Sequence, residues 1–224
     1  MLEDSRNVLL QLKDPSTPLL KKMRQKAPGT YFHSLIVSEL AAGACLIFPN
    51  ANPLLAQVGA LYHDIGKIVN PEAFAENQED GNYPFQPEII ITHVEKSLEI
   101  AQSFNLPEEI RRFMGSHHGT QRAPNSDPDK NNIYPKSFLP ESIEETLVMF
   151  ADSIEAAIRS HGRFDAKGMK KIIDGVIQYK IDQNQLKDSV LLSYDLKPVK
   201  NDFFQTLNAI YHRRHATEVK SLYY

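Results

Sequence analysis

The most informative candidate functional residues of this chain are a histidine and the aspartate that directly follows it. The pair stands at the end of an apolar run, in Leu61-Tyr-His63-Asp64-Ile-Gly66-Lys67. Burying such an ionisable pair is costly unless another charge compensates it, and a bound cation often does so. An isolated His-Asp pair is nevertheless common as a hydrogen-bonded surface pair, so the other histidines must decide between the two interpretations.

Five of the eight histidines lie in or beside segments that are expected to be apolar helices. Each one alone would more often be a satisfied core residue than a ligand. As a set with two aspartates, they would impose a large desolvation cost unless cations were bound. Seven donors exceed the positions that one catalytic ion offers, so the pattern indicates two ions. The candidate ligands are His33, His63, Asp64, His93, His117, His118 and Asp152.

The segments around these residues resemble the HD-domain metal-dependent phosphohydrolases. Within that superfamily the chain is most similar to the cytoplasmic HD domain of seven-transmembrane HD proteins that hydrolyse cyclic di-AMP, over about residues 16–215. The HD-GYP branch, which acts on cyclic di-GMP, is less similar because no Gly-Tyr-Pro triplet follows the histidine pair. The matching segments are Pro28-Gly-Thr-Tyr-Phe-His33-Ser, His63-Asp-Ile-Gly-Lys, Ile91-Thr-His93-Val, His117-His-Gly-Thr120 and Ala151-Asp-Ser-Ile-Glu-Ala-Ala-Ile-Arg159-Ser.

The resemblance implies how the ligands divide. One ion would be held by His33, His63, Asp64 and Asp152, and the other by Asp64, His93, His117 and His118. Asp64 suits the bridging position because a carboxylate can give one oxygen to each ion. Imidazole ligands without thiolate favour transition metals over Mg²⁺ or Ca²⁺, and the resemblance favours iron or manganese. Two such ions would supply a bridging hydroxide as the nucleophile for phosphodiester hydrolysis.

Two basic residues are candidates for contacts with substrate. Lys67 follows Asp64 by three residues, close enough to neutralise a phosphate oxygen, and we assign it a catalytic and substrate-binding role beside Asp64. Arg159 lies two helical turns after Asp152, where it could contact the substrate or pair with Glu155 one turn back.

Composition places the chain among ordinary globular proteins. It has 224 residues, of which 42% are hydrophobic and 24% charged, and a net charge of −3 gives no reason to expect binding to polymeric nucleic acid. The single cysteine, Cys45, cannot form an internal disulfide and is expected to be a core residue in a reducing, cytoplasmic compartment. No run is long and apolar enough for a membrane helix, so we expect no membrane contact by the chain itself, although the resemblance implies attachment to a membrane segment.

The apolar periodicity predicts an all-helical, single compact bundle. We expect a helical lead-in over 1–27, the HD domain over 28–215 and a tail over 216–224, with long polar loops at 69–84 and 121–140. Thr30 is expected to cap a helix, Gly66 to take a left-handed conformation that ends another, and Ser142 with Glu145 to form a capping box. A short helix is expected near 185–192 and a final helix near 199–214.

The resemblance implies that the substrate is cyclic di-AMP. The two loops suit a cyclic dinucleotide, because they leave directly from ligand positions and are long enough to line a cleft for two bases. Tyr83, Phe85 and Tyr134 could stack on purines or anchor the loops to the core. One alternative is a phosphohydrolase of mononucleotides, and another is a regulatory module that binds a cyclic dinucleotide without turnover.

Overall fold

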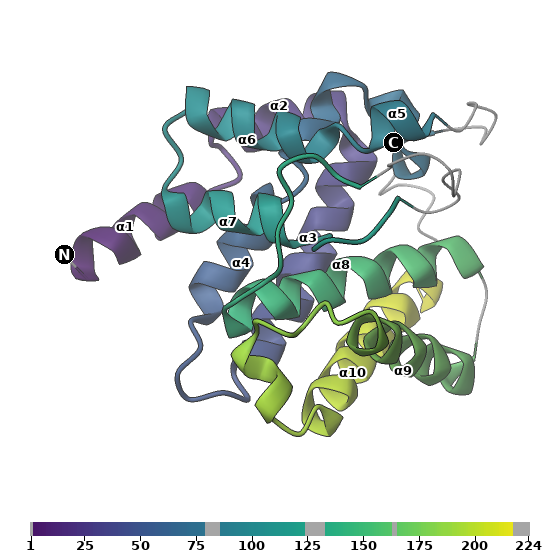
Figure 1. Ribbon diagram of the computed structural model, residues 1–224. Coiled ribbons are helices and arrows are strands. Elements are labelled where there is room, and N and C mark those ends of the chain that lie inside the picture. Colours follow the sequence, from purple (N-terminus) through teal and green to yellow (C-terminus); the bar gives the residue numbers. More distant parts are fainter. Residues whose placement is uncertain (1, 79–85, 124–132, 163–164, 217–224) are drawn as a thin grey trace.

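The computed structural model describes residues 2–78, 86–123, 133–162 and 165–216, which form a bundle of helices around α3 (Figure 1). Those residues contain no strand, only an isolated β-bridge between Arg122 and Ile133, so the predicted fold class is confirmed. The helices are α1 (Leu2–Lys13), α2 (Pro18–Lys26), α3 (Pro28–Cys45), α4 (Pro53–Tyr62), α5 (Pro87–Ile90), α6 (His93–Ser103), α7 (Glu108–Ser116), α8 (Ile143–His161), α9 (Ala166–Asp182) and α10 (Lys197–Ala216). The 3₁₀ helices are η1 (Ile65–Val69), η2 (Pro71–Ala73), η3 (Ala75–Asn77) and η4 (Val190–Ser193).

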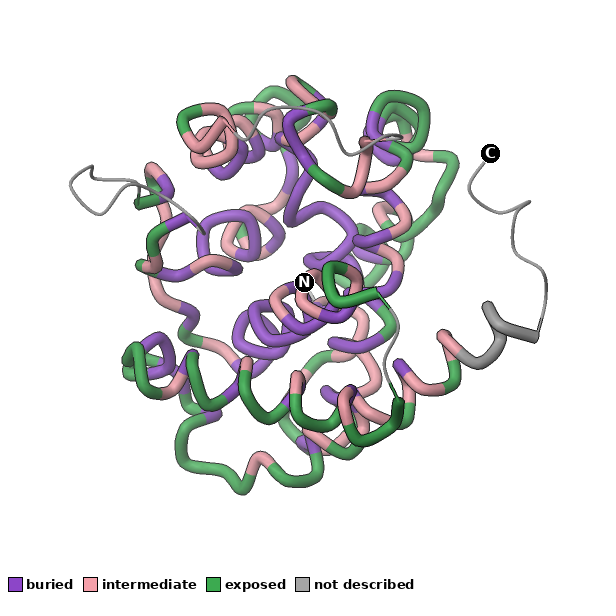
Figure 2. Tube along the Cα trace, turned by 90° about the vertical axis from the view of Figure 1, so that its right-hand side faces the viewer, coloured by how far each residue is buried: buried purple, intermediate pink, exposed green. Residues whose placement is uncertain are grey.

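Helix α3 is central because it is apolar on most of its faces, which is the pattern of a buried helix. It packs against α2, α4, α8 and α10, and Val37, Leu40 and Ala44 have no exposed surface. Figure 2 shows this buried core with exposed residues around its rim. Helices α3 and α4 contribute to two apolar clusters, one shared with α8, α9 and α10 and the other with α1, α2, α6 and α7. Side chains on α3 and at the end of α4 are therefore held from both sides.

The start of α3 differs from the prediction. The helix begins at Pro28, and Thr30 lies in its first turn rather than at the capping position. The backbone N–H of Thr30 donates to Asn77 Oδ1 at 3.1 Å, and its hydroxyl donates to Glu76 Oε1 at 3.2 Å. Side chains from η3 therefore satisfy groups that the first turn of a helix leaves without a partner.

Gly66 is also not the left-handed cap that was expected. It lies inside η1, and the glycines with positive φ among the described residues are Gly119 and Gly162. A Cβ at Gly66 would stand 2.1 Å from the carbonyl oxygen of His93, because α6 packs directly on η1. The Gly66 N–H donates to Ser97 Oγ at 2.8 Å, so this glycine permits a close approach of two backbones.

Several other boundaries change in detail. The segment 69–84, expected to be a loop, contains η2 and η3, and the helix expected near 185–192 is only the 3₁₀ turn η4. Ser142 caps α8 by accepting from the N–H of Glu145 at 3.1 Å. The other half of the expected capping box is displaced, since Glu145 accepts from the N–H of Glu141 instead. None of the described helices has both the length and the apolar character needed to cross a bilayer.

Candidate metal centre

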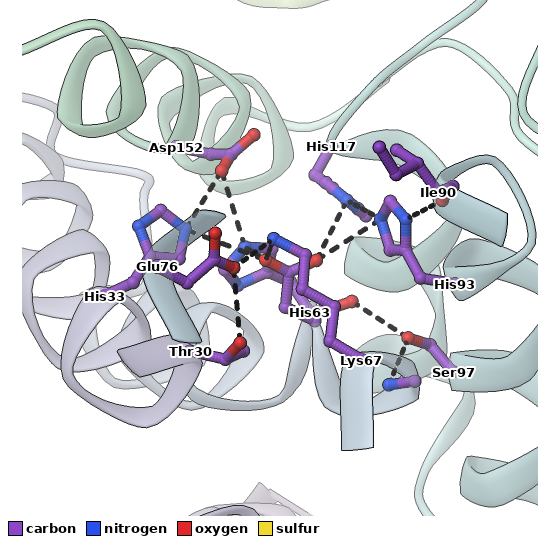
Figure 3. A network of polar contacts seen from close by, with 12 residues as sticks. Thr30, His33, His63, Lys67, Glu76, Ile90, His93, Ser97, His117 and Asp152 are labelled. Atoms are coloured by element: carbon purple, nitrogen blue, oxygen red, sulfur yellow. Dashed lines mark hydrogen bonds and ion pairs between the residues drawn. The ribbon is translucent and has the colours of Figure 1, made fainter. Parts of the chain in front are cut away.

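All seven predicted ligands meet in the interior of the bundle. Figure 3 shows five of them, His33, His63, His93, His117 and Asp152, pointing toward one another. Residues far apart in the sequence converge there because each stands at a helix end or on a buried helical face. His33 is on α3, His63 and Asp64 join α4 to η1, and His93 opens α6. The His117-His118 pair follows α7, and Asp152 is on α8.

Four of these side chains form the first donor group, which consists of His33, His63, Asp64 and Asp152. One ligand atom from each residue lies within 4.8 Å of those of the other three. Nε2 of His33 is 3.1 Å from Asp152 Oδ1, and Nε2 of His63 is 3.2 Å from Asp64 Oδ2. Two imidazoles and two carboxylates at this spacing are a suitable ligand set for a divalent transition metal.

The other three histidines form the second donor group. Nε2 of His93 is 3.2 Å from Nε2 of His117 and 3.1 Å from Nε2 of His118. Asp64 reaches this group with its other oxygen, since Oδ1 lies 3.3 Å from Nε2 of His93 and 3.6 Å from Nε2 of His117. The two oxygens of Asp64 therefore face different donor groups, which is the arrangement that a bridging carboxylate requires.

Backbone carbonyls fix the tautomers of three ligand histidines. Nδ1 lies 2.7 Å from the Ala60 carbonyl in His63, 2.6 Å from the Ile90 carbonyl in His93, and 3.1 Å from the Phe113 carbonyl in His117. A carbonyl can only accept, so each Nδ1 carries the proton that it donates. In the neutral imidazole, which is the form that binds a metal, Nε2 is then left with its lone pair, as in a metal-binding histidine whose other nitrogen is hydrogen-bonded.

The donor atoms fit a pair of cations. Nε2 of His63 and Oδ1 of Asp64 are buried without a hydrogen-bond partner, and Oδ2 of Asp64 is paired with the ammonium of Lys67. In the second group, Nε2 of His93 faces Nε2 of His117, and neither carries a proton to share. Buried lone pairs that face one another need a positive charge between them, and cations would provide it.

The pKa values differ between the two groups in the metal-free chain. In the second group, burial lowers the pKa of His93, lowers that of His117 to about 3 and holds that of His118 well below its usual range. In the first group, burial also acts to lower the pKa, but the neighbouring carboxylates outweigh it and raise the values to about 9 for His33 and about 10 for His63. Protonated imidazoles thus balance the carboxylates where a cation would otherwise do so.

A chain of alternating charges runs along one side of the first group. Lys67 Nζ is 2.7 Å from Asp64 Oδ2 and 2.8 Å from Glu76 Oε1. Arg159 lies 3.6 Å from Glu76 Oε2 and 3.4 Å from Glu155 Oε2, and Glu155 is paired with Nδ1 of His33. Burial acts to raise the pKa of Glu76, but Lys67 and other cations overcome it and lower it to about 2.

Two residues of this series of charges, Glu155 and Glu76, were not predicted as site residues from the sequence. Glu155 had been considered only as a partner of Arg159, although its position three residues after Asp152 puts both carboxylates on one helical face. Glu76 lies in a segment that was expected to be loop, and nothing in its sequence context indicates its contact with Lys67. For Arg159, the pairing with Glu155, one of the two alternatives, is present.

Of the three aromatic residues that could stack on purines or anchor the loops, only Tyr134 lies within the described residues. The Tyr134 ring stacks on the His118 ring, with centroids 3.9 Å apart and planes at 17°, and only 4% of Tyr134 is exposed. It therefore anchors the second group. Tyr83 and Phe85 lie outside the described residues. Cys45 is buried as expected, and burial raises its thiol pKa to about 12.

The donor groups are open to solvent along one edge. The side-chain exposure is 20% for His118, 12% for Lys67 and 8% for Asp152, whereas His33, His63, Asp64, His93 and His117 are at 2% or below. Among the described residues, the solvent-accessible part of the site is therefore formed by His118, Lys67 and Asp152.

Comparison with known proteins identifies the class to which this fold and site belong. Residues 30–157 match the HD domain, so the chain belongs to the HD-domain family. The cyclic-di-AMP phosphodiesterase PgpH of Listeria monocytogenes is 37% identical over 222 residues, which cover 92% of this chain but only 31% of that protein. The chain is an HD-domain phosphohydrolase related to PgpH, and its His/Asp cluster is typical of the metal site of such domains.

Solved structures agree with this assignment. The crystal structure of the L. monocytogenes PgpH HD domain superposes with a TM-score of 0.81 at 34% identity, covering 88% of this chain and 100% of that one. The same domain in complex with cyclic di-AMP gives a TM-score of 0.80 at 35% identity. The bundle described here is therefore the PgpH type of HD domain fold.

Proposed function

We propose that the chain is a dimetal phosphodiesterase that hydrolyses cyclic di-AMP to the linear dinucleotide. The observation that carries this proposal is the position of Asp64 between the two donor groups, one oxygen toward each. One ion would be held by His33, His63, Asp64 and Asp152, and the other by Asp64, His93, His117 and His118. Two bound ions would activate water and stabilise the charge that develops on the phosphate, and we favour iron or manganese.

Lys67 is proposed to bind a non-bridging oxygen of the reacting phosphate. Its ammonium is at the open edge of the site and lies beside Asp64. Glu76 holds it there from the other side, which limits the freedom of a long side chain. Arg159 is proposed to contact the substrate at the same edge, since 32% of its side chain is exposed while Glu155 and Glu76 fix its position.

The choice of cyclic di-AMP is supported by the PgpH relatives and the complex of that HD domain with cyclic di-AMP. A mononucleotide phosphohydrolase would use the same donor groups and is the second candidate. A regulatory module without turnover is less favoured because the full donor set and Lys67 are present. We further propose that the chain works in the cytoplasm as one portion of a longer protein.

Product analysis tests the proposal. Metal-loaded protein would be incubated with cyclic di-AMP, cyclic di-GMP, dATP and dGTP, and the products would be separated by chromatography. We expect the linear dinucleotide from cyclic di-AMP, and slower turnover of cyclic di-GMP. Release of phosphate or triphosphate from the mononucleotides, with both cyclic dinucleotides intact, would replace the proposed function with the second candidate.

A further inference from the structure

Lys180, in the last turn of α9, is a buried ammonium group outside the predicted site. Only 4% of the residue is exposed, and no ion pair with a carboxylate of the described residues involves its Nζ. Its hydrogen-bond partner is the side-chain oxygen of Gln121, 59 residues away in the sequence. Burial lowers the pKa of Lys180 to about 8, and the field of Asp152 opposes this only in part. The group is therefore charged at neutral pH, with no anion beside it in the part of the chain that the structure describes.

The amide of Gln121 adds a donor that has no acceptor. An ammonium can only donate, so the oxygen of the amide must face Lys180 and its NH₂ group must point elsewhere. That Nε2 is buried and has no hydrogen-bond partner. Buried donors without partners are rare in folded proteins, and here an ammonium and an amide NH₂ occur side by side. Together they form a local excess of donors, which we call the Lys180–Gln121 pair.

The pair lies next to the metal centre. Gln121 follows His118 by three residues, and Asp152 is the charged group whose field acts on Lys180. His118 and Asp152 are also the residues at the open edge of the donor groups. Lys67 is paired with Asp64 of the first donor group. Lys180 instead contacts Gln121, in the segment that follows the second donor group.

We propose that the Lys180–Gln121 pair is an anion subsite that binds a phosphate of the substrate other than the one that reacts at the metals. This inference rests on the proposed function, because it requires a nucleotide with more than one phosphate. A phosphate oxygen would accept from the ammonium and from the free NH₂ group, and it would compensate the buried charge. Lys67 cannot serve this second phosphate, since Asp64 and Glu76 hold it at the other side of the centre.

Two substitutions separate a binding role from a structural one. Lys180→Met removes the charge and keeps most of the side-chain volume. Gln121→Glu keeps the shape of the amide and gives Lys180 a carboxylate partner, so it should preserve or raise Tm while it repels an anion. If the pair binds phosphate, each variant should raise KM for cyclic di-AMP by about tenfold or more, as expected for loss of a charged hydrogen bond. If the pair only holds the fold, Gln121→Glu should leave KM unchanged.

The controls use the same metal-loaded protein, with metal content checked for every variant. Bis(p-nitrophenyl) phosphate contains a single phosphate, so its KM should not change. Lys171→Met removes an exposed lysine of the same helix α9 and should leave all constants unchanged. An unchanged nucleotide KM in Lys180→Met and Gln121→Glu, or an equal rise in KM for bis(p-nitrophenyl) phosphate, would overturn the subsite.

Turnover by the wild type alone shows whether the proposed function fails. If the wild type hydrolyses dATP but not cyclic di-AMP, the substrate proposal is wrong, and KM for dATP decides the subsite because dATP also carries phosphates beyond the reacting one. If nothing is turned over, the calorimetric Kd for cyclic di-AMP takes the place of KM. Absence of binding to the wild type would then overturn the subsite as well.

Discussion

At the scale of single residues, the environment of Asp64 explains why ionisable groups can be buried here. Its carboxylate is 1% exposed and lies within 3.3 Å of imidazole nitrogens on both sides. Burial acts to raise the pKa of Asp64, but His63 and Lys67 outweigh it and keep the pKa well below the usual range. The carboxylate is therefore ionised and available as a metal ligand at any pH near neutrality.

The role of Lys67 can be tested by removing its charge. Lys67→Ala should lower kcat/KM by roughly 10- to 100-fold, the loss expected for one charged hydrogen bond to a phosphate oxygen. Metal content should not change, because Asp64 keeps both oxygens. Lys67→Arg should restore activity only in part, since a planar fork replaces a compact ammonium. Steady-state kinetics measure kcat/KM, and elemental analysis measures the metal content. An unaltered kcat/KM in Lys67→Ala would mean that Lys67 only forms ion pairs and does not act on the substrate.

At the scale of elements, the contact between η1 and α6 sets the distance between the two donor groups. His63 and Asp64 directly precede η1, and His93 is the first residue of α6. Gly66 permits this contact, since its N–H donates to Ser97 and a Cβ would collide with the His93 backbone. The spacing of the ligands therefore depends on one glycine that is not itself a ligand.

Gly66→Ala should consequently destabilise the fold and lower the metal content, because η1 and α6 must separate to admit the methyl group. Gly175→Ala is the matched control. Gly175 lies at an exposed position of α9 with open space around a Cβ, and there alanine should stabilise the helix by about 0.5–1 kcal/mol. Urea unfolding and elemental analysis of both variants test this. Equal stabilisation by the two substitutions would show that the η1–α6 contact is less close than described.

The helices, and the residues that form the two donor groups, could be predicted from the sequence because both depend on local signals. Apolar periodicity marks the helices, and His63-Asp64 and His117-His118 stand out within it. The 3₁₀ helices η2 and η3 have no comparable periodicity, so Glu76 could not be placed beside Lys67. The pairing of Lys180 with Gln121 depends on how α9 packs near the end of α7, which no local pattern encodes.

At the scale of the whole molecule, Lys180 should make the free energy of unfolding depend on pH. Its pKa is about 8 in the folded chain, against 10.5 as the ordinary value. Between these values the unfolded state binds more protons, so this group adds stability as pH rises through that range and costs stability below it. Lys180→Met should therefore be more stable than the wild type at pH 7, by an amount on the order of 3 kcal/mol less the lost Gln121 hydrogen bond.

Urea unfolding at pH 7, 8.5 and 10 measures this effect, because other titrating groups largely cancel in the difference between the two proteins. The advantage of Lys180→Met should shrink steadily toward pH 10. A difference that is independent of pH, or a variant that is less stable at pH 7 than at pH 10 relative to wild type, would mean that Lys180 is solvated. A stability cost at neutral pH is expected of a group retained for binding rather than for folding.

The most direct test of the account is the number of metal ions per chain. Wild-type protein and Asp64→Ala would be reconstituted with ferrous iron or manganese without oxygen, freed of unbound metal and measured by elemental analysis. The shared carboxylate predicts two ions per wild-type chain and the loss of both in Asp64→Ala, because each donor group depends on one of its oxygens. A wild type that binds no metal or only one ion, or an Asp64→Ala variant that retains two, would contradict the central claim.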